Sequence, residues 1–106
     1  MNEDCTNPTP YAVASTVLPG LAKMAQESAE LTHVIMRIME VGGMDHWRGN
    51  QRQNLLDEMA DVLAAIKYFG HRNLTYGERL NLEANSLTKF TKTLEWERTH
   101  NFQPGD

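Results

Sequence analysis

The chain has 106 residues, of which 41% are hydrophobic and 23% charged, and its net charge is −4 at pH 7. This length fits one domain of ordinary size, and the composition is typical of a folded globular protein. The acidic balance argues against a protein that binds nucleic acid by neutralising phosphates. No apolar run approaches the roughly 20 residues that span a bilayer, and the first residues do not form a signal segment. We therefore expect a cytoplasmic protein without membrane or nucleic-acid partners.

The first half of the chain predicts a leader and then helices. Residues 1–10 form a loose polar leader with two prolines, and residues 11–18 favour a short helical turn or two. The next helix runs from about Pro19, which is tolerated in a first turn, to Val41. A glycine pair follows it and predicts its end. Residues 44–50 form a loop.

The second half predicts two further helices. One covers about Gln51 to Phe69 and is closed by Gly70. Thr75 and Glu78 have the spacing of a capping box, which opens a last helix to about His100. Residues 101–106 form a frayed tail. Because no alternation typical of strands persists, we expect a single all-α domain over residues 11–100, four-helix-bundle-like, with short connections.

Two acidic pairs, each three residues apart, lie on the two long predicted helices. They are Glu27/Glu30 and Glu58/Asp61. At 100° per residue, Glu27 and Glu58 each fall inside the apolar arc of their helix, and Glu30 and Asp61 each lie about 60° away on its border. The matching offsets predict that two helices packed through these arcs bring four carboxylates together.

Carboxylates on a packing face are costly unless a positive charge meets them, and four together repel one another. A hard divalent cation removes both problems, and an all-oxygen ligand set selects Mg²⁺, Mn²⁺ or Ca²⁺ over zinc. The alternative is that the border carboxylates pair with surface Lys or Arg. The duplicated offset favours the cation.

The pattern E-x-x-E followed by E-x-x-D resembles that of the MazG-like, all-α nucleoside triphosphate pyrophosphohydrolases. It is carried by A-Q-E-S-A-E-L and L-L-D-E-M-A-D-V-L, with 27 residues between the pairs, and the similarity covers roughly residues 19–100. The resemblance implies a MazG-type fold in which Glu27, Glu30, Glu58 and Asp61 bind Mg²⁺ between antiparallel helices. Gln26 stands where the family often has an acidic residue, so the number of metal ions is left open.

The resemblance also implies an activity, the hydrolysis of a (d)NTP to a (d)NMP and pyrophosphate. The four carboxylates would then be catalytic as well as metal-binding, with Mn²⁺ as a possible substitute for Mg²⁺ and one Glu orienting the water. The family implies a homodimer or homotetramer whose neighbouring subunit helps line the pocket.

Four further residues are candidates for substrate binding. Lys23 lies one turn before Glu27 on the same face, where it would reach a phosphate or form an i, i+4 ion pair with Glu27. Asn85 and Lys89 share a face of the last helix, which is a phosphate contact under the resemblance or simply a solvated face. Trp47, in the loop between the metal helices, would stack on a base or cover the end of the bundle, and we favour the cover.

Three other functions compete with this prediction. A phosphoribosyl-ATP pyrophosphohydrolase has similar helices. A non-catalytic helical interaction module would leave the acids on the surface. A di-iron carboxylate protein would use Glu30-x-x-His33, but the second helix has no matching His, and His33 lies away from the apolar arc. We therefore expect His33 to be a surface histidine.

Overall fold

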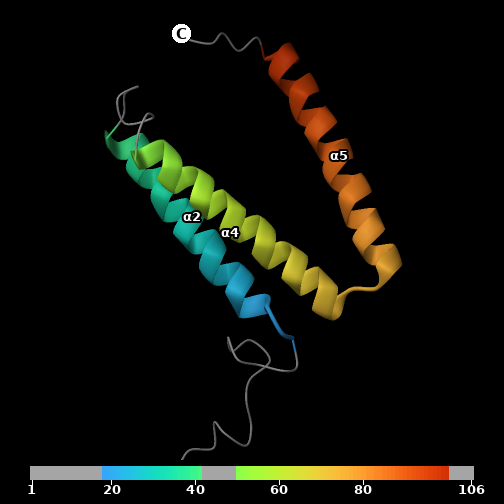
Figure 1. Cartoon of the computed structure of the whole chain (residues 1–106). Coiled ribbons are helices and arrows are strands. Elements are labelled where there is room, and N and C mark those ends of the chain that lie inside the picture. Colours follow the sequence, from blue (N-terminus) through green and yellow to red (C-terminus); the bar gives the residue numbers. More distant parts are fainter. Residues whose placement is uncertain (1–17, 42–49, 101–106) are drawn as a thin grey trace, which may run out of the picture. The chain divides into compact units, whose positions relative to one another are not determined.

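The computed structural model describes residues 18–41 and 50–100, and the elements within these ranges are three helices (Figure 1). They are α2 (Leu21–Val41), α4 (Asn50–Asn73) and α5 (Tyr76–Thr99). The prediction of an all-α protein is confirmed for this part of the chain. The leader, the tail, and all but the last residue of both the short helix predicted at 11–18 and the predicted loop lie outside the described residues. Leu18 is not helical, and Asn50 is the first residue of α4.

Helix α2 begins two residues later than predicted. Gly20 has a φ of 94°, a left-handed conformation that glycine adopts without cost and that no helix contains, so Pro19 and Gly20 form a turn instead of a first helical turn. The Leu21 amide donates to the Leu18 carbonyl at 3.2 Å, and the Met24 amide donates to the Gly20 carbonyl at 3.0 Å. The turn is therefore followed directly by the first residue of α2.

Helix α4 continues through Gly70, and the predicted end at this glycine was wrong. Gly70 is buried inside the last turns of α4, which runs on to Asn73. Asn73 Nδ2 donates to the Phe69 carbonyl at 3.0 Å and to the Pro19 carbonyl at 2.8 Å. The tertiary bond to Pro19 and the basic last turn, with His71 and Arg72, support the longer helix against the low helix propensity of glycine.

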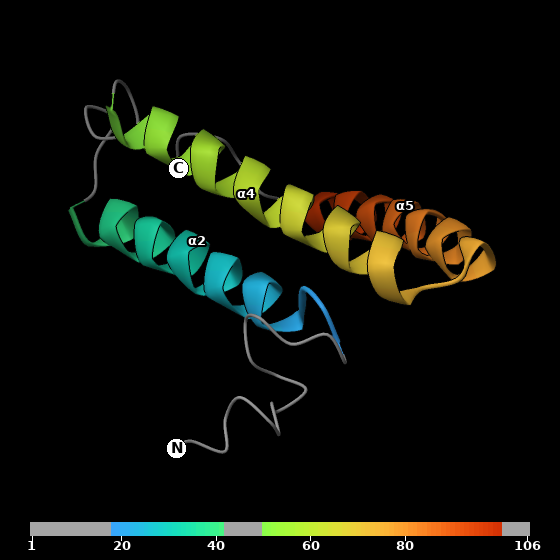
Figure 2. The same cartoon turned by 60° about the horizontal axis from the view of Figure 1, so that its bottom comes forward.

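Helices α2 and α4 pack side by side and antiparallel, as Figures 1 and 2 both show. The contact runs along two rows of buried or half-buried residues spaced alternately by three and four, which we call the seam. In α2 the row contains Met24, Glu27, Leu31, Val34 and Ile38, and in α4 it contains Gln51, Leu55, Glu58, Val62, Ala65 and Phe69.

In an antiparallel pair, residues at the same angular offset from the seam lie on the same face of the pair. The two sides of each seam row therefore form two faces, to which both helices contribute. On one side lie the exposed residues Lys23, Glu30, Asp61 and Tyr68, which we call the acidic face. On the other side lie exposed apolar residues, which we call the apolar face: Ile35, Met39, Met59, Leu63 and Ile66. Only part of the predicted apolar arc of each helix is therefore covered by the other helix.

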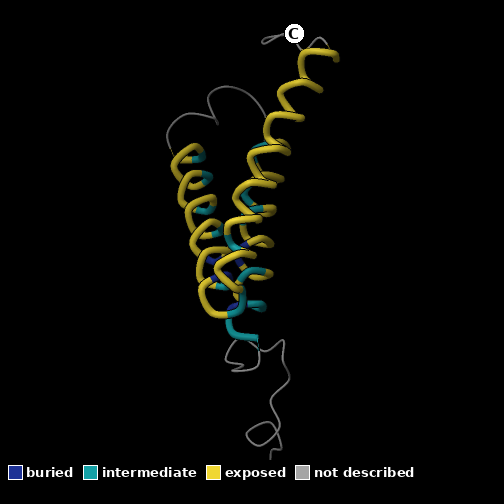
Figure 3. The backbone as a smooth tube through the Cα atoms, turned by 90° about the vertical axis from the view of Figure 1, so that its right-hand side faces the viewer, coloured by how far each residue is buried: buried dark blue, intermediate teal, exposed yellow. Residues whose placement is uncertain are grey.

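Helix α5 belongs to a second unit, Leu74–Asp106, which is described here by itself. Its capping box is confirmed: Glu78 N donates to Thr75 Oγ1 at 3.1 Å, and Thr75 N donates to Glu78 Oε1 at 2.8 Å. No residue of α5 is buried, and Figure 3 draws it almost entirely as exposed. Side-chain hydrogen bonds within α5 also join Thr88, Thr91 and Thr93 to the carbonyls four residues before them.

Within the described ranges, no helix has an apolar stretch long enough to cross a membrane.

Candidate metal site between α2 and α4

Three of the four predicted carboxylates meet at the seam. One oxygen each from Glu27, Glu58 and Asp61 lies within 4.8 Å of the others. Glu27 is 6% exposed and Glu58 is half-buried, because both stand in seam rows, whereas Asp61 reaches in from the acidic face. Exposed acidic residues often gather without a ligand, so the buried position of Glu27 is what sets this group apart.

Two buried oxygens of this group have no hydrogen-bond partner. They are Glu27 Oε1 and Glu58 Oε1. Burying a carboxylate oxygen without a partner costs free energy, and it raises the pKa because the charged form loses its water. The pKa of Glu58 is raised above its ordinary value of 4.5 chiefly by this desolvation and then by the charges of Glu30, Asp61 and Glu27. A cation bound by Glu27 and Glu58 would offset the charges of both carboxylates.

Lys23 pairs with Glu27, which is one of the two alternatives predicted for it. Its Nζ lies 2.7 Å from Glu27 Oε2. The hydrogen bond and charge of Glu27 raise the pKa of Lys23 above its ordinary value of 10.5, so this side chain is cationic at neutral pH. Because the Lys23 side chain is 51% exposed and Glu27 is buried, the lysine covers the group from the solvent side.

Glu30 stands outside the group of three but beside it. With Glu58 it lines a hollow of about 360 Å³, together with Ala29, His33 and Val34. Its charge contributes to the raised pKa of Glu58. His33 is exposed, as predicted for a surface histidine.

The remaining predicted residues are not brought to the three carboxylates by anything described. Asn85 and Lys89 are exposed on α5, in the second unit. Trp47 lies outside the described residues. Their predicted contacts with a substrate stay predictions.

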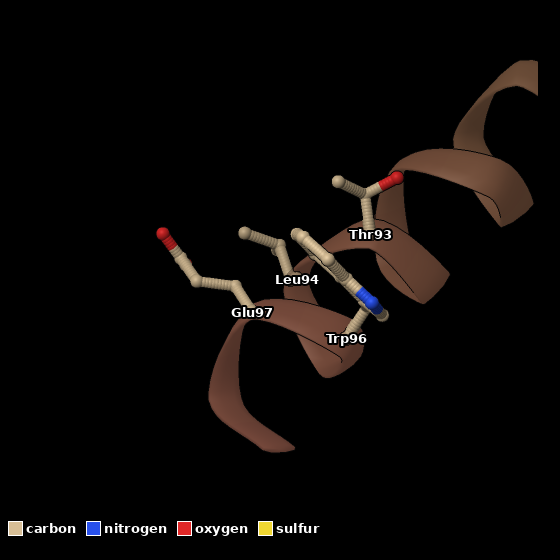
Figure 4. A pocket seen from close by; sticks show the side chains of 4 residues that line it. All are labelled: Thr93, Leu94, Trp96 and Glu97. Atoms are coloured by element: carbon tan, nitrogen blue, oxygen red, sulfur yellow. The ribbon is translucent and has the colours of Figure 1, made fainter. Parts of the chain in front are cut away.

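Helix α5 carries a hollow of its own near its end, shown in Figure 4. Thr93, Leu94, Trp96 and Glu97 line it, and all four come from this one helix. A surface made by neighbouring turns of one exposed helix holds no converging polar groups, so it is not a candidate for a small-molecule site.

Sequence reasoning missed a second hollow, of about 480 Å³, on the acidic face. We call it the Tyr68 hollow, and it is lined by Lys23, Glu27, Asp61, Ala64, Ala65 and Tyr68. Tyr68 lies two turns after Asp61 on α4. That spacing was the signal for it in the sequence, since residues seven apart share a helix face.

The chain matches no family model, no curated protein and no solved structure.

Proposed function

We propose that the protein is a magnesium-dependent nucleotide pyrophosphohydrolase that cleaves a (d)NTP to a (d)NMP and pyrophosphate. One observation carries the proposal: the carboxylates of Glu27, Glu58 and Asp61 converge at a buried seam, where two of their oxygens lack a partner. The fit to Mg²⁺ rests on the all-oxygen donor set and on those two oxygens. The resemblance to the MazG-like enzymes supplies the reaction and the expectation of a four-helix, MazG-type fold.

Each carboxylate has a different position from which to act. Glu27 and Glu58, held in the seam, would bind the cation in fixed places, and the exposed Asp61 would complete the site from the acidic face. Bound Mg²⁺ supplies charge neutralisation on the triphosphate and polarisation of a phosphoryl oxygen. Glu30, which lines one hollow together with Glu58 and His33, would accept a proton from the attacking water. The water oxygen replaces the pyrophosphate oxygen on the α-phosphorus, and pyrophosphate leaves.

Pyrophosphate release from a panel of NTPs and dNTPs with Mg²⁺ tests the activity, and calorimetry with Mn²⁺ alone tests the metal site. We expect Glu27→Gln to lose Mn²⁺ binding and to lower turnover roughly 100-fold or more, the range for removing a preorganised electrostatic group. Glu40→Gln is the matched control, since it removes the same charge from an exposed position of α2. Absence of turnover with every nucleotide would refute the enzyme, and full activity of Glu27→Gln would refute the site.

Self-association as a homodimer or homotetramer is a part of the proposal. Among the described hydrophobic residues, Ala65 alone is buried, at 5% exposure, and the apolar face of the pair lies open. A folded chain gains most of its stability by burying such surface, so a second copy is the expected partner. Light scattering should give a mass of two or four chains, and a monomer at working concentration would contradict this.

A non-catalytic helical interaction module is the second candidate, and α5 favours it. This helix leaves Leu80, Leu87 and Leu94, spaced by seven, between 48% and 66% exposed. A stripe of this kind is typical of a surface that binds another helix. The two candidates differ at the seam: the module has no use for a cation, and Mn²⁺ binding with the affinity of a specific site would decide for the enzyme.

A further inference from the structure

Of the two hollows next to the three carboxylates, the Tyr68 hollow is lined by more side chains. Ala64 and Ala65 leave room at its floor, because neither side chain extends beyond Cβ. Lys23 comes to it from α2 and Tyr68 from α4, with Glu27 and Asp61 at its edge. One buried oxygen at this edge, Glu27 Oε1, has no partner, and Glu27 is 6% exposed. The hollow thus opens directly onto the place proposed for the cation.

The Tyr68 ring is held in position before any ligand arrives. A Cβ at Gly20 would stand 2.8 Å from Tyr68 Cδ2, so the ring packs directly on the glycine backbone. Arg72 Nη1 donates to the Tyr68 hydroxyl at 3.2 Å. Its guanidinium also lies over the ring, 5.9 Å from the centroid. Tyr68, which lines the hollow, and Arg72, which contacts its ring and hydroxyl, therefore form one positioned unit, and the ring face under the guanidinium is not open to a stacking base.

The two hollows next to the carboxylates differ in the charged side chains that line them. Beyond the carboxylates toward the Pro19 end stand two cations, Lys23 and Arg72. Toward the other end, the hollow of Glu30 and Glu58 is lined by no Lys or Arg among the described residues. Of the two hollows, the Tyr68 hollow is therefore the one whose own lining offers an anion a charge-assisted hydrogen bond, from Lys23. A guanidinium with five N–H donors suits a phosphate oxygen especially well.

We propose that the Tyr68 hollow receives the β- and γ-phosphates of the substrate, bound by Lys23, the Tyr68 hydroxyl and Arg72. This inference rests on the proposed function, because it takes the α-phosphate to lie at the carboxylates. Lys23 neutralises Glu27 until a divalent cation takes over that carboxylate, and the flexible, half-exposed lysine then turns to the phosphates. The nucleoside extends toward the hollow lined by His33.

The test uses inorganic pyrophosphate as the probe, titrated calorimetrically into the full chain in the presence of saturating Mn²⁺. Loss of one charge-assisted contact should weaken pyrophosphate binding about tenfold or more in Arg72→Gln and in Lys23→Gln. Tyr68→Phe keeps the ring packed on Gly20 and should weaken pyrophosphate binding several-fold. Lys67→Gln, the matched control, removes the same charge from the neighbouring position of α4, which faces away, and should change the affinity by less than about twofold.

Titration with Mn²⁺ alone separates the two proposals. If Mn²⁺ does not bind the wild-type chain, the proposed function fails. If Mn²⁺ binds the wild type and Arg72→Gln equally well, the pair is folded and the metal site intact. Unchanged pyrophosphate binding by Arg72→Gln would then overturn the phosphate subsite and leave the function standing. Equal weakening by Arg72→Gln and Lys67→Gln would overturn it too, because it would show a general effect of charge.

Discussion

Helices α4 and α5 are both 24 residues long and lie almost end to end in the sequence, yet their side chains meet different surroundings. α4 packs on α2 and buries Ala65 and Gly70. α5 buries nothing and begins with a capping box of its own. Of the acidic pair on α4, Glu58 lies in this packing, and desolvation there raises its pKa above the ordinary value. The acidic residues of α5 are exposed.

The largest expected difference between the two regions is their response to a divalent cation. At a concentration of 100 times the Kd, a cation that binds only the folded pair stabilises it by about 2.7 kcal/mol. Amide hydrogen exchange in α2 and α4 should therefore slow on addition of Mg²⁺ and should return to its original rate when EDTA removes the cation. The amides of α5 serve as the internal reference. Equal slowing in all three helices would show that the cation acts on the whole chain and not on the pair.

Enlarging one buried alanine sharpens the comparison next. Ala65→Leu adds volume at a seam position that is only 5% exposed, next to the Tyr68 hollow, and should destabilise the pair by about 1–3 kcal/mol, measured by urea unfolding. Ala84→Leu makes the same change on exposed α5 and should lie within about 0.5 kcal/mol of the wild type. Similar effects at the two positions would contradict the burial described here.

Substitution of two glycines by alanine should change the free energy of unfolding in opposite directions. Gly20→Ala forces a side chain into the left-handed region at φ 94° and against the Tyr68 ring, which should cost about 1–2 kcal/mol. Gly77 lies in the first turn of α5, and a Cβ there meets nothing within 4 Å. Gly77→Ala should therefore stabilise α5 by about 0.5–1 kcal/mol. Helicity by circular dichroism and unfolding midpoints check both, and destabilisation by Gly77→Ala would reveal a contact on α5.

The capping box offers a change confined to α5. Thr75→Ala removes the acceptor for the Glu78 amide and should cost about 1 kcal/mol of helix stability, seen as faster hydrogen exchange in the first turns of α5. Mn²⁺ binding should be unchanged. A loss of metal binding in this variant would show that α5 is needed to form the site.

The stability of the α2–α4 helix pair should depend on pH through Glu58, whose pKa is higher in the folded chain than its ordinary value of 4.5. The folded state then holds this proton more tightly than the unfolded state, so the metal-free pair becomes less stable as the pH rises through the raised pKa. Stability should rise as the pH falls from neutral toward 4.5. Glu58→Gln should raise the metal-free midpoint at pH 7 and flatten this part of the profile, whereas Glu83→Gln on α5 should do neither.

Much of the pair could be predicted from the sequence because helical periodicity is a local property. The matching offsets of Glu27 and Glu58 placed both in the seam, and the capping box placed the start of α5. The end of α4 could not be predicted, since it depends on the bond from Asn73 to Pro19, 54 residues away in the chain. The spacing of Tyr68 from Asp61 gives its face of α4, but the packing of its ring depends on Gly20, which a helix pattern does not place.

The junction between α4 and α5 has a consequence for assembly. Asn73 satisfies the end of α4 with its own side chain, and Thr75 and Glu78 satisfy the start of α5, so Leu74 alone joins two finished helix ends. The Leu74 carbonyl accepts from Arg79 Nη1 at 2.8 Å, a bond that lies wholly on the α5 side. A rotation about this joint breaks none of these bonds. Exchange of α5 between neighbouring chains, a low-cost route to dimers, would therefore leave the hydrogen bonds named here in place.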